Sequence, residues 1–172
     1  MVTTLLWSWA VILVSRAMPN PIRKFPPIVD LIPHSRTMCL LDRVIHKDED
    51  QTQCTMIVSK TDPFADVSGN VPSYVGVEYI SQCAAAHSGL KSRNERGKTA
   101  PRVAFLLGSR KVEMFVESFP AGQVLLIQAA RISATEDTAI FSGEIRDADS
   151  NDVLLKAKLT YYQPKTVDES MA

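Results

Sequence analysis

The sequence predicts one α+β domain, in which a single long helix packs against a curved antiparallel sheet of about five to six strands. Three observations lead to this prediction. The chain has 172 residues, an ordinary length for one domain. Helical spacing of apolar residues extends over one long stretch, residues 72–90. Strand-like sequence dominates from residue 102 to residue 162, so the sheet has to curl around the helix to bury it.

The helix is predicted over residues 72–90, because Pro72 and Ser73 supply a start signal and Gly89 a stop signal. A polar, basic loop is predicted to follow, over residues 91–100. The apolar positions of the helix recur at helical spacing and predict its buried face: Val75, Tyr79, Ile80, Cys83, Ala86 and Leu90.

A second face of this helix is polar. Tyr74, Glu78 and Gln82 are each four residues apart, and residues at this spacing lie one above the other on a helix. A carboxylate therefore lies in the second turn, with an amide one turn further on. The small residues 84–86 are all alanine and would let neighbouring backbone approach closely.

Strands and turns are predicted on both sides of the helix. A short helical turn is expected at residues 28–32, and the first two strands read as a hairpin. Alternation puts Cys54, Met56 and Val58 on one face of the second strand, and Val124, Leu126 and Ile132 on one face of a later strand. The predicted strands are residues 39–47, 51–60, 102–107, 111–116, 124–133, 138–146 and 153–162.

Composition excludes several classes of function. Apolar residues make up 45% and charged residues 22% of the chain, as in an ordinary soluble domain. The formal net charge is zero, so no overall field favours a nucleic acid or an anionic membrane. The three cysteines are widely spaced and form no metal-binding pattern with histidine, so we expect no metal, no cofactor and a reducing, cytoplasmic compartment.

The domain boundaries are predicted from the two ends of the chain. Residues 1–17 include an apolar run too short to span a bilayer, and they read as an unstructured or mis-assigned extension or, alternatively, as an export or anchoring segment. Residues 18–27 form a Pro-rich lead-in, residues 28–164 the domain, and residues 165–172 a flexible tail.

Three segments carry a resemblance to a known family. Residues 31–44 read L-I-P-H-S-R-T-M-C-L-L-D-R-V, residues 77–82 read V-E-Y-I-S-Q, and residues 119–124 read F-P-A-G-Q-V. These segments resemble the 3-hydroxyacyl-acyl carrier protein dehydratases of bacterial fatty acid synthesis, which have the hot-dog fold. With residues 72–82 and F-L-L-G-S-R further on, the chain is similar to a divergent branch that includes predicted dehydratases of aryl-polyene pigment synthesis.

One departure from the main family concerns catalysis. That family carries its catalytic histidine in a G-H-F-P motif, 14 residues before the helix glutamate, and Phe64 occupies this position here. No histidine lies between His46 and His87. The resemblance therefore carries over the glutamate, Glu78, but not that histidine.

Dehydration of a 3-hydroxyacyl thioester needs a base for the C2 proton, an acid for the leaving hydroxyl, and donors for the thioester oxygen. Glu78 is the main catalytic candidate. His34 could take the missing acid/base role if the fold brings it near Glu78, or it could be a structural histidine. His87 is expected to be a packed core residue and His46 a solvated one.

Substrate binding is predicted at the start of the helix. The resemblance implies that backbone N–H groups there hold the thioester oxygen, and these would belong to Tyr74, Val75 and Gly76. Gly76 would also let a ligand approach the backbone closely. The Tyr74 hydroxyl could donate to the ligand, or its ring could pack over the pocket mouth, and Gln82 could orient Glu78 or a water molecule.

Three functions stay open at this point. The first is a dehydratase acting on an acyl chain carried by acyl carrier protein or coenzyme A, whose acidic groups would suit the basic residues of the 91–100 loop. The second is a non-catalytic hot-dog partner subunit, and the third is a hot-dog thioesterase. An open sheet edge would favour a homodimer, or a heterodimer with a hot-dog paralogue. No nucleic acid and no stable membrane insertion are expected.

Overall fold

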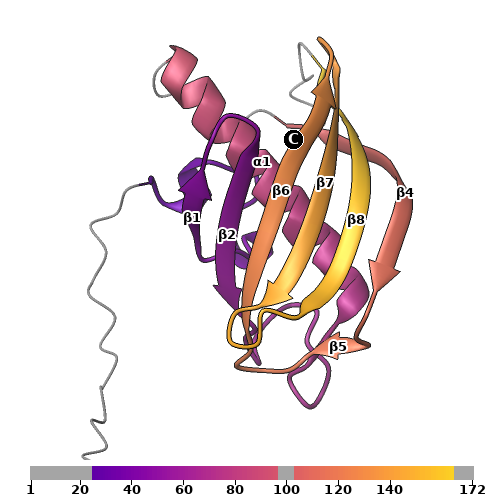
Figure 1. The fold of residues 1–172 in the computed structure, drawn as a ribbon. Helices are drawn as coiled ribbons and strands as arrows, with labels where there is room; N and C mark the ends of the chain where they lie inside the picture. Colours follow the sequence, from indigo (N-terminus) through magenta and orange to yellow (C-terminus); the bar gives the residue numbers. More distant parts are fainter. Residues whose placement is uncertain (1–24, 97–102, 165–172) are drawn as a thin grey trace, which may run out of the picture.

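The computed structural model describes residues 25–96 and 103–164. One six-stranded antiparallel sheet with the strand order β1-β2-β6-β7-β8-β4 wraps around one long helix, α1, and the strands β3 and β5 form a separate pair (Figure 1). The predicted class, a hot-dog fold with a central helix, is confirmed. The predicted segments 1–17 and 165–172, residues 18–24 of the predicted lead-in 18–27, and residues 97–100 of the predicted loop lie outside the described residues.

The main sheet and the small pair contain eight strands in chain order. A hairpin joins β1 to β2 as predicted, with Val44 opposite Cys54. The predicted strands at residues 102–107 and 111–116 are one continuous strand in the structure. The bounds are Arg43–Lys47 (β1), Gln51–Ile57 (β2), Val71–Pro72 (β3), Phe105–Met114 (β4), Ser118–Phe119 (β5), Val124–Ala134 (β6), Thr138–Asp147 (β7) and Val153–Tyr162 (β8).

Short 3-10 turns cover Ile28–Asp30 (η1), Arg36–Met38 (η2) and Ser73–Val75 (η3). The helix α1 begins after η3 and extends over Gly76–Arg96. The prediction that Gly89 ends the helix and that a loop begins at residue 91 was therefore wrong. A Cβ added at Gly89 would lie 2.2 Å from the carbonyl oxygen of Leu31, so this glycine permits a close approach of backbone in mid-helix.

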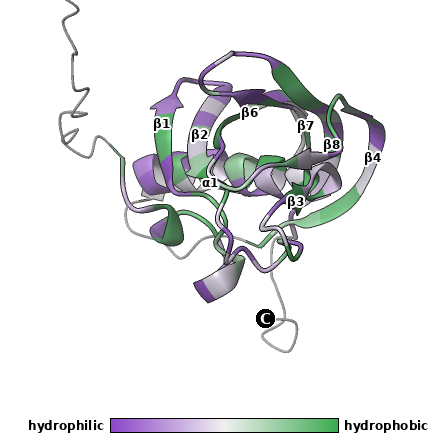
Figure 2. Cartoon of the chain, turned by 90° about the horizontal axis from the view of Figure 1, so that it is seen from below, coloured by the Kyte–Doolittle hydropathy of each residue, from purple (hydrophilic) through white to green (hydrophobic). Residues whose placement is uncertain are grey.

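The core lies between α1 and the concave face of the sheet, which Figure 2 shows end-on. The helix positions predicted to be buried are all buried. On β6 the buried face is not the one that carries Val124, Leu126 and Ile132, because Leu125, Ile127 and Ala129 are the fully buried residues. Both faces of this strand start with apolar residues, so alternation alone did not distinguish them.

No helix among the described residues is long and apolar enough to cross a membrane. Along β2 and the residue that follows it, the predicted face agrees with the structure, since Cys54, Met56 and Val58 are buried. On β8 the inward residues Leu155, Ala157 and Leu159 are buried, while Lys156 and Lys158 are exposed.

Candidate active site

A loop between η1 and β1 brings His34 to the helix. The backbone of Leu31 lies against Gly89 of α1, and Leu31 and Ile32 are buried. The chain then turns at Pro33, and His34 Nε2 lies 3.2 Å from Glu78 Oε1. The histidine and the glutamate of the resemblance are thus neighbours within one chain.

Gln82 fixes this arrangement from one turn further along α1. Its side chain is fully buried, and its Nε2 donates to Glu78 Oε1 at 2.9 Å and to the carbonyl oxygen of Met38 at 2.8 Å. Its Oε1 accepts the backbone N–H of Leu40 at 3.0 Å. One amide therefore orients the carboxylate and also holds the loop that carries His34.

Glu78 and His34 are only partly exposed, with 34% and 30% of their side chains accessible. They line one cavity of about 160 Å³, so the carboxylate does not stand in bulk solvent. Apolar residues form much of the wall: Pro33, Ala84, Ala85, Ala104, Leu106 and Phe141. His34 Nδ1 is buried and has no hydrogen-bond partner among the described residues.

Two hydroxyl groups in this cavity were not predicted to be site residues. Tyr161 on β8 donates to Ser81 Oγ at 2.9 Å, and Ser81 donates to the carbonyl oxygen of Val77 at 2.8 Å. Burial is the main cause that raises the pKa of Tyr161 well above its usual value. The spacing of three residues after Glu78 could have indicated Ser81 as a site residue. Its contact with Tyr161 could not be predicted in this way, because the two residues are 80 positions apart in sequence.

The start of the helix does not reach the same cavity. Tyr74 is 66% exposed, Val75 is buried, and neither lies among the residues described as lining the cavity. The N–H of Gly76 donates to the carbonyl oxygens of Ser73 and Tyr74. A Cβ at Gly76 would contact Ile145 and Leu155 at 2.8 and 3.0 Å, so packing against the sheet is enough to explain this glycine, and the approach of a ligand to its backbone stays a prediction.

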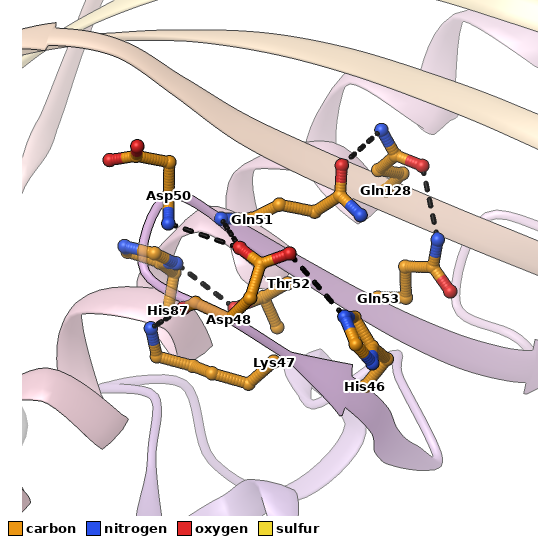
Figure 3. Close-up of polar contacts among 9 residues, drawn as sticks. All are labelled: His46, Lys47, Asp48, Asp50, Gln51, Thr52, Gln53, His87 and Gln128. Atoms are coloured by element: carbon orange, nitrogen blue, oxygen red, sulfur yellow. Dashed lines mark hydrogen bonds and ion pairs between the residues drawn. The ribbon is translucent and has the colours of Figure 1, made fainter.

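His87 lies apart from the candidate site and is a core residue, as predicted. It is 1% exposed, and its Nδ1 lies 3.0 Å from Thr52 Oγ1 (Figure 3). Burial, followed by the nearby positive charges of Lys47 and Arg131, lowers its pKa to about 4. The ring is therefore neutral at pH 7.

His46 stands at the surface, where half of its side chain is exposed and its Nε2 lies 3.4 Å from Asp48 Oδ2 (Figure 3). This position agrees with the prediction of a solvated residue. Within residues 25–96 and 103–164, no cluster of three or more histidine, cysteine or acidic side chains has the arrangement of a metal site.

Comparison with known proteins places this geometry in context. The family described as ApeP-like, ApeP dehydratase, matches residues 26–172. A chain of the dehydratase heterocomplex ApeI:P from Xenorhabdus doucetiae is 31% identical, with 83% of this chain and 94% of that chain covered and a TM-score of 0.76. A search of curated proteins finds no match.

More distant structures share the fold. Zebra fish thioesterase superfamily member 2 is 14% identical, with 80% of this chain and 91% of that chain covered and a TM-score of 0.57. The PaaI protein of E. coli is also 14% identical, with coverages of 69% and 80% and a TM-score of 0.52. At this identity the likeness concerns the hot-dog architecture alone.

Proposed function

The chain belongs to the ApeP-like dehydratase family, and we propose that it removes water from a 3-hydroxyacyl thioester in the cavity beside Glu78 and His34. The observation that carries this proposal is the 3.2 Å contact between His34 Nε2 and Glu78 Oε1. It supports an acid/base pair in which His34 supplies the function of the histidine that the main family has elsewhere. We propose acyl carrier protein or coenzyme A as the carrier, and the cytoplasm as the location.

The reaction needs two proton transfers, and the pair has one group for each. One member accepts the C2 proton, and the other, in its protonated form, donates to the 3-hydroxyl. The C3–O bond breaks, water leaves, and a C2–C3 double bond forms. Gln82 orients the carboxylate through its Nε2 donor, which is 2.9 Å from Glu78 Oε1.

The thioester oxygen needs hydrogen-bond donors as it gains negative charge. Neither Tyr74 nor Val75 lines the cavity beside Glu78, but their backbone amides belong to the turn that opens the helix, and on this ground we propose them as substrate-binding groups. The N–H of Gly76 already donates within that turn, so it is less available to the thioester oxygen than the N–H groups of Tyr74 and Val75.

Hydration of a crotonyl thioester tests the proposal, since the loss of enoyl absorbance reports the reverse reaction. We expect Glu78→Gln to abolish the activity and His34→Gln to lower it by at least about 100-fold, the usual scale for loss of an acid/base group. His46→Gln is the matched control at an exposed histidine. Wild-type activity in Glu78→Gln would contradict the site assignment, and release of free thiol would indicate a thioesterase instead.

A second candidate function is that of a non-catalytic partner subunit, and two observations favour the association with another chain that it requires. One chain of the solved ApeI:P heterocomplex is 31% identical to this chain. The strand β4 is an edge of the sheet, and it exposes the apolar residues Phe105, Leu106, Leu107 and Met114. Such an edge suits pairing with another hot-dog chain, either a paralogue or a second copy.

Mixing experiments separate the two functions. A partner subunit would show no hydration activity alone but would change the activity of a hot-dog paralogue, in a way that Glu78→Gln leaves unaltered. A dehydratase would be active without the paralogue, and Glu78→Gln would remove that activity. Size-exclusion chromatography of each sample reports whether a homodimer or a heterodimer forms.

A further inference from the structure

Two hydroxyl groups in the Glu78 cavity have their hydrogens committed inside the protein. The carbonyl oxygen of Val77 can only accept, so the contact of 2.8 Å uses the hydrogen of Ser81. Ser81 then has only lone pairs for the contact of 2.9 Å with Tyr161, so the Tyr161 hydrogen is used there. Both hydroxyl oxygens can therefore only accept further hydrogen bonds.

The pair is rigidly placed beside the acid/base groups. Tyr161 is 7% exposed, and its ring packs edge-on against Phe141, with centroids 6.0 Å apart. Ser81 is one turn of α1 beyond Glu78, and Ser81, Tyr161, Glu78 and His34 all line the same cavity. Because its pKa is raised, Tyr161 keeps its proton throughout the physiological range.

We propose that Ser81 and Tyr161 form an acceptor pair that binds the hydrogen of the substrate 3-hydroxyl, and that this pair makes the site select 3-hydroxyacyl over 3-oxoacyl thioesters. The inference rests on the proposed function and adds two specificity-determining residues to it. A 3-hydroxyl can donate a hydrogen bond, whereas a 3-oxo group can only accept one. The acceptor pair therefore gives a bound 3-oxo group no hydrogen bond and turns lone pairs toward its oxygen, which is unfavourable in a partly buried cavity.

The same contact would also serve the chemistry. An acid at Glu78 or His34 must reach a lone pair of the hydroxyl oxygen, so the hydroxyl hydrogen has to point elsewhere. The acceptor pair lines the same cavity and would hold the hydrogen away from the acid. Selection of the substrate and orientation of its leaving group would then come from one hydrogen bond.

Isothermal titration calorimetry with two ligands tests the proposal without turnover. The ligands are the 3-hydroxybutyryl and 3-oxobutyryl amides of pantetheine, in which an amide replaces the thioester. We expect the full-length wild-type protein to prefer the 3-hydroxy ligand. Tyr161→Phe keeps the ring against Phe141, and it should weaken binding of the 3-hydroxy ligand about three- to tenfold while leaving the 3-oxo ligand unaffected.

Ser81→Ala is expected to act on the 3-oxo ligand instead. Without Ser81 the Tyr161 hydrogen is released and can donate into the cavity, so the 3-oxo ligand should gain affinity and the preference should shift toward it by about three- to tenfold. A merely structural role for Ser81 would weaken both ligands alike. Tyr162→Phe, the next residue on β8 and outside the lining residues, is the matched control and should not change the preference.

The result that overturns the proposal is an unchanged ratio of the two affinities in Tyr161→Phe and Ser81→Ala, or a wild-type protein that does not favour the 3-hydroxy ligand. This outcome can be told apart from failure of the proposed function. If Glu78→Gln loses hydration activity while the ratio stays unchanged, the dehydratase stands and the acceptor pair is wrong. If Glu78→Gln remains active while the ratio of affinities shifts as expected, the acceptor pair stands and the assignment of Glu78 as a catalytic group is wrong.

Discussion

Gly89→Ala should destabilise the protein, although alanine is normally the better helix residue. A Cβ at this position would lie 2.2 Å from the carbonyl oxygen of Leu31, about 0.8 Å short of the 3.0 Å that real contacts keep. The neighbouring atoms are backbone, so the loop and helix have to separate. Overpacking of this kind costs about 3 kcal/mol at the upper end, and the helix propensity of alanine offsets about 1 kcal/mol, which leaves a net loss of about 2 kcal/mol.

Urea unfolding measures this loss. With a slope of about 2 kcal/mol/M, the midpoint should fall by roughly 1 M at a fixed protein concentration. Activity should also fall, because Leu31 precedes His34 by three residues and a shift of about 1 Å in a catalytic group can cost on the order of 100-fold.

The matched control is Gly108→Ala on β4, where a Cβ would meet no atom within 4 Å. Its free energy of unfolding should stay within about 0.5 kcal/mol of the wild-type value. If Gly89→Ala unfolds at the wild-type midpoint or above it, the explanation of Gly89 as a packing glycine is refuted, and helix propensity alone decides at this site.

Two further predictions concern buried polar groups. Gln82→Met keeps the volume of the side chain but leaves the N–H of Leu40 and the carbonyl oxygen of Met38 without their partner. Calorimetry or urea unfolding should therefore show that the free energy of unfolding falls by about 2 to 4 kcal/mol. An unchanged free energy of unfolding would contradict the role of Gln82 in holding the loop. The pKa of His87 is lowered from 6.5 to about 4 in the folded state. Between pH 6.5 and pH 4 the imidazole is therefore protonated in the unfolded state but not in the folded state. The free energy of unfolding should fall by up to about 3 kcal/mol as the pH drops from 6.5 to 4. His87→Gln should show a flatter pH profile in this window, and an equally steep profile would assign the effect to other groups.

Local patterns predicted the framework because each depends on residues close in sequence. The buried stripe of α1 was predicted from spacing alone, and Tyr79, Ile80 and Cys83 are fully buried. Gly89 misled the prediction of the helix end because a glycine that ends a helix and one that admits a neighbouring backbone look alike in sequence. Only the approach of Leu31, 58 positions away, distinguishes them.

The candidate site depended on contacts that spacing does not encode. The sequence placed Glu78 and Gln82 on one helix face, and their hydrogen bond agrees with that placement. It named His34 without locating it, because the fold of the preceding loop decides its distance from Glu78. Tyr161 lies on the buried face of its strand, and its bond to Ser81 needed the three-dimensional arrangement.

The edge strand β4 has two roles at once, since Leu106 belongs both to its exposed apolar row and to the wall of the cavity beside Glu78. A chain that adds a strand there would contact the Leu106 side chain, which a bound acyl group would also contact. Assembly and ligand binding would then be thermodynamically linked: the factor by which the added chain changes the affinity for the ligand must equal the factor by which the ligand changes the affinity for the added chain.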